Sequence, residues 1–328
     1  MSSNSDAAVF IEAKGLKKYF PVTEGLIFEK VAGWVKAVDG VDFTIYKGET
    51  FGLVGESGCG KTTTSRLLLL LEELTAGSIL FEGREVSSLK GAGLSHYRQS
   101  LQAVFQDPTS ALNPRMRVEE IVGEPIIAMG TMPKYDIAER VKEVLIEVGL
   151  NPASASLYPH EFSGGQRQRI AVARALAPSP QCIILDEPVS ALDVSIRAQI
   201  LNLLGDLQNR FGFSYLVIAH DLAAVKYMSK RVGVMYLGKL VETAESDELY
   251  SHPLHPYTQA LLSAALPSHP DDKHEEIVLG GEVPSPLNPP AGCRFHPRCQ
   301  YVMPVCSESE PPLKEVSSRH QVACFLHP

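Results

Sequence analysis

Hydrophobic and polar residues along the chain follow two strand-like patterns. Residues 7–50 and 78–88 contain short runs that alternate between apolar and polar positions. A period of two with one polar face predicts a small antiparallel sheet. Three further runs are apolar on both faces and are separated by helical stretches, namely residues 51–54, 182–185 and 215–219. These runs predict buried parallel strands, so the two patterns together indicate an α/β fold with a small antiparallel β subdomain.

A third pattern, with the period of a helix, occupies the middle of the chain. One stripe of residues 136–150 is apolar and consists of Ile137, Val141, Val144, Leu145 and Val148. This spacing predicts an amphipathic helix, with Asp136 and Glu139 as a capping pair at its start. The flanking stretches are also helical in character, so we expect a helical insert over about residues 107–165. Thirteen of the 23 prolines lie after residue 250, which predicts a loop-rich end of the chain without long helices.

Composition limits the classes of protein to consider. The chain has 328 residues, 45% of them hydrophobic, and its mean hydropathy is −0.00, as in a globular protein of about two domains. No apolar run approaches the roughly 18 residues of a membrane span, and residues 1–8 lack the features of a secretory signal. We therefore expect a cytoplasmic protein. The net charge of −8 argues against nucleic acid as the main ligand.

The most informative motif is Gly-Glu-Ser-Gly-Cys-Gly-Lys-Thr at residues 55–62. An apolar strand at 49–54 precedes it and a leucine-rich helix at 63–71 follows it, which is the context that a phosphate-binding loop requires. Its glycines let backbone N–H groups turn toward a phosphate chain. We expect Lys61 to reach the β- and γ-phosphates and the Thr62 hydroxyl to bind Mg²⁺; a glycine-rich turn before a buried helix is the alternative. The residues expected around the nucleotide are Gly55, Glu56, Ser57, Gly58, Cys59, Gly60, Lys61, Thr62 and Thr63.

Two further motifs are suited to phosphate chemistry. The apolar run at 182–185 ends in Asp186 and Glu187, which could hold the Mg²⁺ shell and polarise an attacking water; an acidic surface end of a strand is the simpler alternative. Residues 163–166 open a helix and form a second anion-binding helix start, or only a capped helix with a basic face. Because the chain has one phosphate loop, we infer that this second site reads the γ-phosphate held by another chain. Its residues are Ser163, Gly164, Gly165 and Gln166.

These motifs, in this order, resemble those of the ABC transporter ATPases over about residues 9–260. The matching positions are, in chain order, the adenine-stacking Tyr19, the Q-loop Gln106, the signature residues 163–166, the D-loop residues 190–193 ending in Asp193, and the switch His220. The resemblance implies that two cassettes close head to tail over two ATP molecules. It implies Mg²⁺ ligands at Thr62, Gln106 and Asp186. It also implies that Glu187 orients or deprotonates water and that His220 contacts the γ-phosphate.

The later part of the chain resembles one branch of this family. Residues 253–262, with His-Pro-Tyr at 255–257, and residues 105–108 and 111–114 are similar to segments of dipeptide, oligopeptide and nickel importer ATPases, most of all the peptide "F" subunits. The resemblance implies a paralogous ATPase partner, two transmembrane permeases that contact the region after Gln106 and the helical insert, and an extracytoplasmic peptide-binding protein. It places the chain peripherally at the cytoplasmic face of the inner membrane. Alternatives are the ATPase of a nickel or other small-solute transporter, an exporter ATPase, and a soluble nucleic-acid-acting ABC ATPase.

Four cysteines lie in the last 36 residues with the spacing C-x5-C-x6-C-x17-C; they are Cys293, Cys299, Cys306 and Cys324. Four thiolates can hold Zn²⁺ or a [4Fe–4S] cluster, and these gaps are longer than those of most structural zinc sites. The resemblance to peptide-importer ATPases that carry such a set further favours a structural iron–sulfur cluster. Zinc, with His296 or His320 as a possible ligand, and reduced free thiols are the alternatives.

The other two cysteines, Cys59 and Cys182, are expected to be bystanders. Cys59 occupies a variable position of the phosphate loop and Cys182 begins a buried strand. We therefore expect an ATPase domain over residues 1–260 and a C-terminal extension with the four-cysteine site over residues 261–328.

Overall fold

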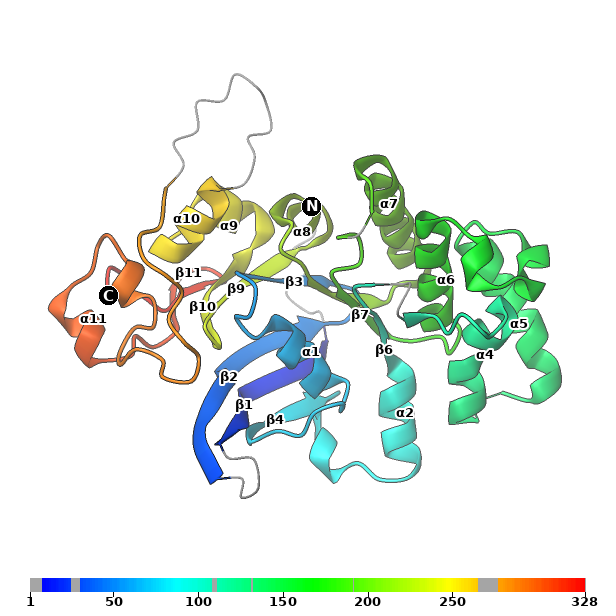
Figure 1. Ribbon diagram of the computed structural model, residues 1–328, viewed down its shortest axis with the longest axis horizontal. Coiled ribbons are helices and arrows are strands. Elements are labelled where there is room, and N and C mark those ends of the chain that lie inside the picture. Colours follow the sequence, from blue (N-terminus) through cyan, green and yellow to red (C-terminus); the bar gives the residue numbers. More distant parts are fainter. Residues whose placement is uncertain are drawn as a thin grey trace. The chain divides into compact units, whose positions relative to one another are not determined.

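The computed structural model describes residues 8–24, 30–107, 111–130, 132–190, 192–264 and 277–327. The chain divides into two compact units, whose elements are labelled in Figure 1. Unit 1 comprises Met1–Phe10, Ile45–Thr50 and Phe81–Ile218, and unit 2 comprises Ile11–Thr44, Phe51–Leu80 and Ala219–Pro328. Unit 2 continues past residue 260 without a division there. The expected boundary between an ATPase domain and a C-terminal extension at residue 260 therefore stays a prediction. The features expected at residues 1–7, at Pro108 and at Ala191 lie outside the described residues.

Parallel strands form the sheet of unit 1. They are β6 (Leu101–Val104), β7 (Cys182–Asp186) and β8 (Ser214–Ile218), and β7 lies between the other two. Every residue of β7 and β8 is buried, which confirms the buried strands predicted at 182–185 and 215–219. The parallel register aligns the end of β6 with β7 and pairs Asp186 with Ile218 of β8. The carboxyl ends of the three strands therefore lie at one edge of the sheet.

Helices account for most of the rest of unit 1. The remaining elements are β5 (Arg84–Glu85), η1 (Val86–Ser88), α2 (Ala92–Ser100), α4 (Val118–Met129), α5 (Lys134–Glu147), η2 (Pro152–Ser156), η3 (Pro159–Glu161), α6 (Gly164–Leu176) and α7 (Val194–Phe211). Helices α4, α5 and α6 pack against one another (Figure 1). The predicted middle helix is α5, with Val148 as its C-terminal cap. All five apolar positions predicted for this helix are buried, which confirms that it is amphipathic.

The start of α5 differs from the prediction. The helix begins at Lys134 with Pro133 as its N-cap, so the expected capping pair of Asp136 and Glu139 is wrong. Asp136 lies within the first turn, and Glu139 instead pairs with Lys142 at 3.3 Å. The φ of −59° at Pro133 leads the chain into the helix two residues before the first acidic side chain.

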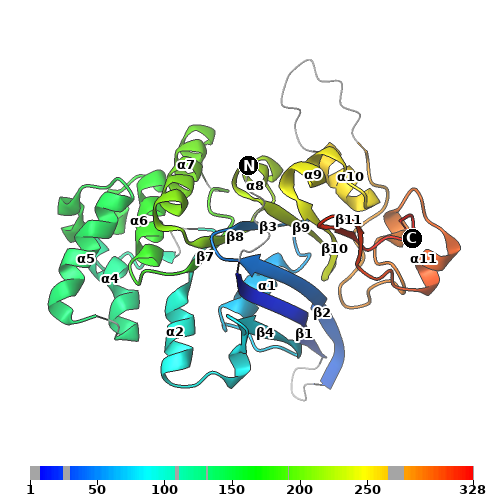
Figure 2. The same cartoon turned by 180° about the vertical axis from the view of Figure 1, so that it is seen from behind.

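Unit 2 contains most of a small sheet and part of a parallel one. The strands β1 (Val9–Glu24), β2 (Lys30–Tyr46) and β4 (Ala76–Phe81) are neighbours in the order β2-β1-β4 (Figure 2). The alternating pattern predicted a small sheet in this part of the chain. Strand β3 (Thr50–Val54) runs parallel to β9 (Arg231–Tyr236). Strand β9 pairs antiparallel with β10 (Lys239–Glu245), β10 with β12 (His320–Val322), and β12 with β11 (Lys314–Ser317). The sequence predicted none of the four strands β9, β10, β11 and β12.

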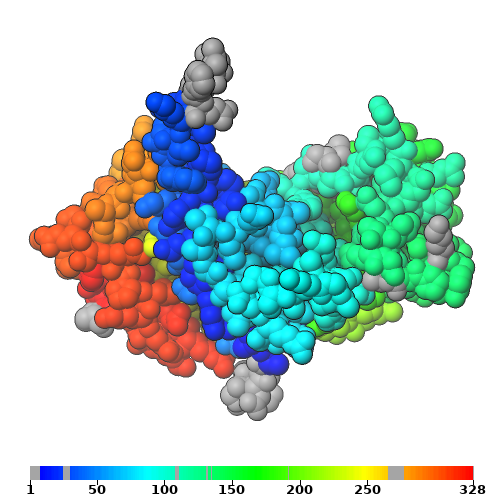
Figure 3. Space-filling view, turned by 90° about the horizontal axis from the view of Figure 1, so that it is seen from below, coloured from blue at the N-terminus to red at the C-terminus, as the bar shows by residue number. Residues whose placement is uncertain are grey.

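The helices of unit 2 are short. They are α1 (Lys61–Leu68), α8 (Leu222–Met228), α9 (Ser246–Ser251), α10 (Pro256–Ser263), η4 (His296–Arg298) and α11 (Pro304–Glu308). The helix predicted at 63–71 corresponds to α1, which ends earlier, at Leu68. Leu70 has a φ of 56°, a left-handed conformation that does not fit an α-helix. The described residues after 277 gather beside the N-terminal strands (Figure 3) and form only short elements, as their prolines predicted. Within the described ranges, no helix is long and apolar enough to cross a membrane.

Candidate functional site

The phosphate loop of unit 2 connects β3 to α1 and is fixed by two glycines. Gly55 has a φ of 152° and Gly60 a φ of 111°, values that favour glycine. A Cβ at Gly55 would lie 2.1 Å from the backbone oxygen of Met235, and one at Gly60 would lie 2.2 Å from that of Ala37. Neither contact can be relieved by a side-chain rotation, so both positions require glycine. The backbone therefore adopts the compact loop that the sequence predicted.

Lys61 is buried at the start of α1 and its ammonium group binds the loop itself. Its Nζ donates hydrogen bonds to the backbone oxygens of Gly55 at 2.6 Å and Glu56 at 3.0 Å, and it lies 3.6 Å from Sγ of Cys59. Burial raises the pKa of Cys59, and the charge of Lys61 opposes this rise. The cation thus lies at the centre of the loop, where a phosphate chain would meet it.

The remaining side chains of the loop differ in their exposure. Ser57, Gly58 and Thr62 are exposed, and Thr63 is half-buried. The next hydroxyl, that of Thr64, is buried and donates to the Gly60 backbone oxygen at 3.0 Å. Thr62 is therefore accessible at the mouth of the loop, whereas Thr64 stabilises its backbone.

In unit 1, the predicted carboxylates lie at the edge formed by the ends of the parallel strands. Asp186 is buried as the last residue of β7, and Glu187 follows it with a φ of 50°. The Glu187 N–H donates to the Ile218 oxygen at 2.7 Å, and the Ser190 hydroxyl donates to the Glu187 oxygen at 3.1 Å. A left-handed backbone at a non-glycine residue costs energy and is maintained only by such surrounding contacts.

Gln106 meets Glu187 at this edge. It lies two residues beyond β6, and its Nε2 donates to Oε2 of Glu187 at 2.7 Å. The structure therefore brings together two residues that the sequence had assigned to one reaction. His220 belongs to unit 2, where it is exposed and follows β8 by two residues. The paired position of Asp186 on β8, Ile218, lies two positions before His220.

The signature residues form an exposed helix start. Ser163 caps α6: its Oγ accepts from the Gln166 N–H at 3.4 Å, and the Gln166 side chain accepts from the Ser163 N–H at 3.0 Å. A Cβ on Gly165 would lie 2.6 Å from Cγ2 of Ile196 in α7. Ser163, Gly164 and Gln166 are exposed, and so is Asp193, the N-cap of α7. The capped helix predicted from the sequence is confirmed, and its positive end faces outward.

Tyr19 belongs to a charged network that the sequence did not predict. Its hydroxyl donates to the Asp39 carboxylate, which also accepts from Arg294. Burial and the bond to Asp39 raise the pKa of Tyr19 to about 12. Burial raises the pKa of Asp39, but the Tyr19 hydrogen bond and the charges of Lys239, Arg294 and Lys17 outweigh it, so that pKa is lowered overall. Adenine stacking by Tyr19 stays a prediction.

The four C-terminal cysteines are free thiols that lie near one another. The pKa of Cys293 is raised to about 11, mainly by burial, with smaller contributions from the charges of Cys306, Cys324 and Cys299. Burial also raises the pKa of Cys299 and of Cys324, with added contributions from neighbouring thiols. Among the described residues, no group of three or more Cys, His, Asp or Glu side chains is placed so that it could hold a metal ion.

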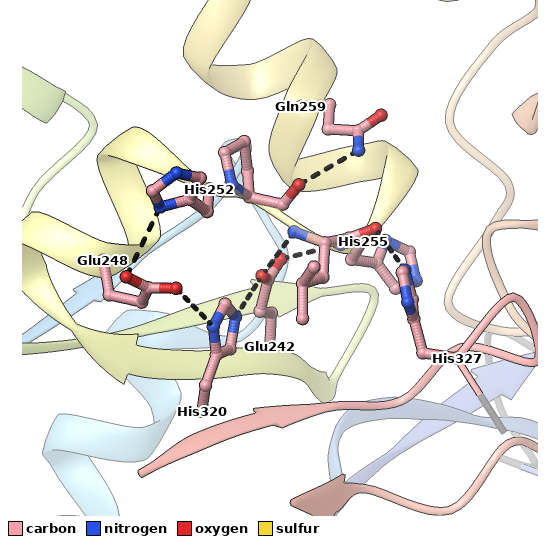
Figure 4. Close-up of polar contacts among 9 residues, drawn as sticks. Glu242, Glu248, His252, His255, Gln259, His320 and His327 are labelled. Carbon is pink, nitrogen blue, oxygen red and sulfur yellow. Dashed lines mark hydrogen bonds and ion pairs between the residues drawn. The ribbon is translucent and has the colours of Figure 1, made fainter. Parts of the chain in front are cut away.

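His320, the alternative zinc ligand, is committed elsewhere. Figure 4 shows it beside Glu242, and its Nε2 lies 2.7 Å from Glu242 Oε1. Both side chains are buried, and the same carboxylate accepts from the N–H groups of Leu254 at 2.7 Å and His255 at 3.0 Å. This network anchors β12 to the start of α10. The other possible zinc ligand, His296, lies beside the cysteine segment, with its Nδ1 2.9 Å from the Cys293 oxygen.

Comparison with known proteins gives these motifs their context. The family described as "ABC transporter" matches residues 38–190, and "Oligopeptide/dipeptide transporter, C-terminal region" matches residues 241–306. The oligopeptide transport ATP-binding protein AppF of Bacillus subtilis is 52% identical over 97% of this chain and 97% of its own length. The chain belongs to the ATP-binding proteins of oligopeptide and dipeptide ABC transporters.

Other members of this ABC family support the same placement. The dipeptide transport ATP-binding protein DppF of Escherichia coli is 46% identical over 96% of this chain and 93% of its own length. A dimeric ATP-binding cassette in a post-hydrolysis state, bound to ADP and Pi, matches the fold with a TM-score of 0.62 and 28% identity, over 72% of this chain and 98% of that chain. The ABC cassette fold and the family predicted from the motifs are thereby confirmed.

Proposed function

We propose that this chain binds and hydrolyses ATP to energise an importer of di- and oligopeptides. The observation that carries the proposal is the phosphate loop, in which Gly55 and Gly60 force the backbone into a compact turn around the Lys61 ammonium group. This loop belongs to a chain that shares about half of its sequence, over nearly its full length, with peptide transport ATP-binding proteins. The loop then supplies backbone N–H groups and a cation to the phosphates of ATP.

Hydrolysis would use the carboxylates at the strand ends. Thr62, Gln106 and Asp186 would hold Mg²⁺, which offsets the negative charge of the phosphates when it is bound. The hydrogen bond from Gln106 orients the Glu187 carboxylate, which would take a proton from the attacking water. His220 would contact the γ-phosphate from the loop that follows β8.

The second half of each ATP site would come from a partner cassette. The capped start of α6 exposes Ser163, Gly164 and Gln166, so its positive end is available to a phosphate held by another chain. The related cassette bound to ADP and Pi is dimeric. A paralogous ATPase chain is the proposed partner, with Asp193 near the shared interface.

Permeases would dock on unit 1. A cavity of about 490 Å³ lies beside the start of α4; its lining includes Ala111, Leu112, Asn113, Pro114, Met116, Ile121, Glu124 and Arg174. Arg174 pairs with Glu124 at 2.7 Å across one side of it. This is the region after the Q-loop where the two transmembrane permeases are expected, and their binding would hold the chain at the cytoplasmic face of the inner membrane. An extracytoplasmic binding protein would deliver the peptide.

Reconstitution tests this function. The chain, its partner ATPase and the permeases are assembled in lipid vesicles, and phosphate release is measured with a binding protein loaded with dipeptide or with Ni²⁺. We expect stimulation by the peptide-loaded protein alone. Stimulation by the nickel-loaded protein alone would identify a nickel transporter, and stimulation of the isolated chain by DNA or RNA would identify a nucleic-acid-acting ATPase.

We propose in addition that the four C-terminal cysteines hold a [4Fe–4S] cluster. Their donor set consists of four free thiols, and the charges of neighbouring cysteines contribute to the raised pKa values of Cys293, Cys299 and Cys324. Bound iron would stabilise the thiolate forms that burial disfavours. The cluster would have a structural role, because it would join Cys293 and Cys299 to α11 and to the segment after β12.

A further inference from the structure

Arg298, in the short segment between Cys293 and Cys299, binds the phosphate loop directly. Its Nη1 lies 2.9 Å from Oε2 and 3.2 Å from Oε1 of Glu56, and its Nη2 lies 3.2 Å from Oε1. The Arg298 side chain is only 8% exposed. A bidentate arginine–carboxylate pair of this kind fixes the orientation of the carboxylate as well as its position.

Tyr257 holds the same residue through the backbone. Its hydroxyl accepts a hydrogen bond from the Glu56 N–H at 2.8 Å. The buried ring of Tyr257 packs against Tyr236 and Phe295, with centroid distances of 4.7 Å and 5.5 Å. Glu56 is therefore held at its side chain and its N–H, while its backbone oxygen accepts from Lys61. A shift of Glu56 would move an acceptor of the Lys61 ammonium group.

Arg294 makes a similar contact with the other predicted part of the nucleotide site. It donates to the Asp39 carboxylate and to the Leu237 backbone oxygen. Arg294 and Asp39 are both buried, with side chains 8% and 9% exposed. The same carboxylate accepts from the hydroxyl of Tyr19, the residue expected to stack on adenine.

We propose that residues 294–298 form a clamp that positions the phosphate loop and Tyr19, so that the C-terminal extension sets the affinity for ATP. The inference rests on the proposed nucleotide site and adds Arg294, Arg298 and Tyr257 to it as positioning residues. Because the clamp lies between Cys293 and Cys299, a rearrangement of the cysteine segment would be transmitted to the loop through two side chains. The peptide transporter ATPase would thereby sense the state of its own extension.

The clamp is tested on the full chain by measuring the Kd for ATP, and KM and kcat in the assembled transporter. We expect Arg298→Ala to raise Kd and KM about 5- to 30-fold, the scale of a pairwise coupling between contacting residues, and to leave kcat nearly unchanged. Arg298→Lys keeps the charge without the bidentate geometry, so its Kd and KM should lie between those of Arg298→Ala and of the unaltered chain. In a Glu56→Ala background, Arg298→Ala should have no further effect. Arg319→Ala, which removes an exposed pair with Glu245 at 3.0 Å, is the matched control and should leave Kd unchanged.

The outcomes separate the clamp from the nucleotide site. If Lys61→Ala loses ATP binding while Arg298→Ala binds ATP like the unaltered chain, the clamp is overturned and the site stands. If Lys61→Ala itself binds ATP normally, the proposed site fails. Should Arg298→Ala not fold, Tyr257→Phe removes only the oxygen that accepts from Glu56 and carries the same test: a raised Kd supports the clamp and an unchanged Kd overturns it.

Discussion

Nε2 of Gln106 donates a 2.7 Å hydrogen bond to Oε2 of Glu187, although the two residues are 81 positions apart in the chain. Each follows one of two neighbouring parallel strands, β6 and β7, whose ends are aligned by their register. The bond limits the rotation of the Glu187 carboxylate, whose backbone is already fixed at a φ of 50°. A group that must take a proton from one water molecule benefits from this fixed orientation.

Glu187→Gln should slow ATP hydrolysis about 10²–10⁴-fold, the usual contribution of a positioned acid–base group, while ATP binding is retained. The amide keeps the shape of the side chain but cannot accept the proton. Phosphate release by the assembled transporter and the Kd for ATP measure the two effects separately. Glu143→Gln alters an exposed carboxylate on α5, paired with Arg140 at 3.1 Å, and should change neither. Unaltered turnover in Glu187→Gln would exclude this role.

Gly165→Ala should destabilise the chain by about 1–3 kcal/mol, the usual cost of overpacking. The new methyl would lie 2.6 Å from Cγ2 of Ile196, so α6 and α7 would have to separate at the signature loop. Chemical denaturation measures the loss, and adding Ile196→Ala should recover part of it. Gly205→Ala, in α7 with open space around its Cβ position, is the control and should be neutral or stabilising. Equal behaviour of the two glycine variants would contradict the packing argument.

His255 should make stability fall at mildly acidic pH. Its pKa is lowered to about 4, mainly by burial; the Glu242 carboxylate opposes this decrease and a charge on His327 adds to it. As pH falls, His255 takes up a proton near pH 6.5 in the unfolded chain and only at lower pH in the folded chain. The stabilisation that comes from keeping His255 neutral is therefore complete above pH 6.5 and is lost as pH falls toward 4. The difference is roughly 2–4 kcal/mol.

The free energy of unfolding between pH 7 and pH 4.5 measures this contribution. His255→Asn, which retains a side-chain acceptor for the Tyr257 N–H, should show a shallower dependence on pH than the unaltered chain. His252, whose side chain is 71% exposed, provides the control variant His252→Gln, with an unchanged slope. The same slope in the His255 variant would show that this residue does not titrate between the two states.

The sequence predicted the parts of the site that depend on local pattern. Apolar runs identified β7 and β8, and the spacing of glycines identified the loop that Gly55 and Gly60 require. The contact between Arg298 and Glu56 spans 242 positions and that between Arg294 and Asp39 spans 255. Such pairs leave no periodic signal, because only the folded chain brings them together. The strands β11 and β12 were missed because they are short and lie among prolines.

Iron content tests the proposed cluster. After strictly anaerobic purification, we expect about four irons per chain, as a [4Fe–4S] cluster requires, and a clear loss of iron in Cys293→Ser. Cys182→Ser, which alters a cysteine buried in β7, should retain the iron and serves as the control. About one zinc and no iron would contradict the cluster, and neither metal would indicate free thiols.

The central claim is most directly tested by a calorimetric titration of the full chain with Mg²⁺ and ATP, alongside the Lys61→Ala variant. Because the Lys61 Nζ lies at the centre of the loop, its loss should weaken ATP binding about 10- to 100-fold, the scale of a charged hydrogen bond. Lys142→Ala, at an exposed position of α5, should bind as the unaltered chain does. Equal affinity of Lys61→Ala and the unaltered chain would contradict the assignment of this loop as the ATP site.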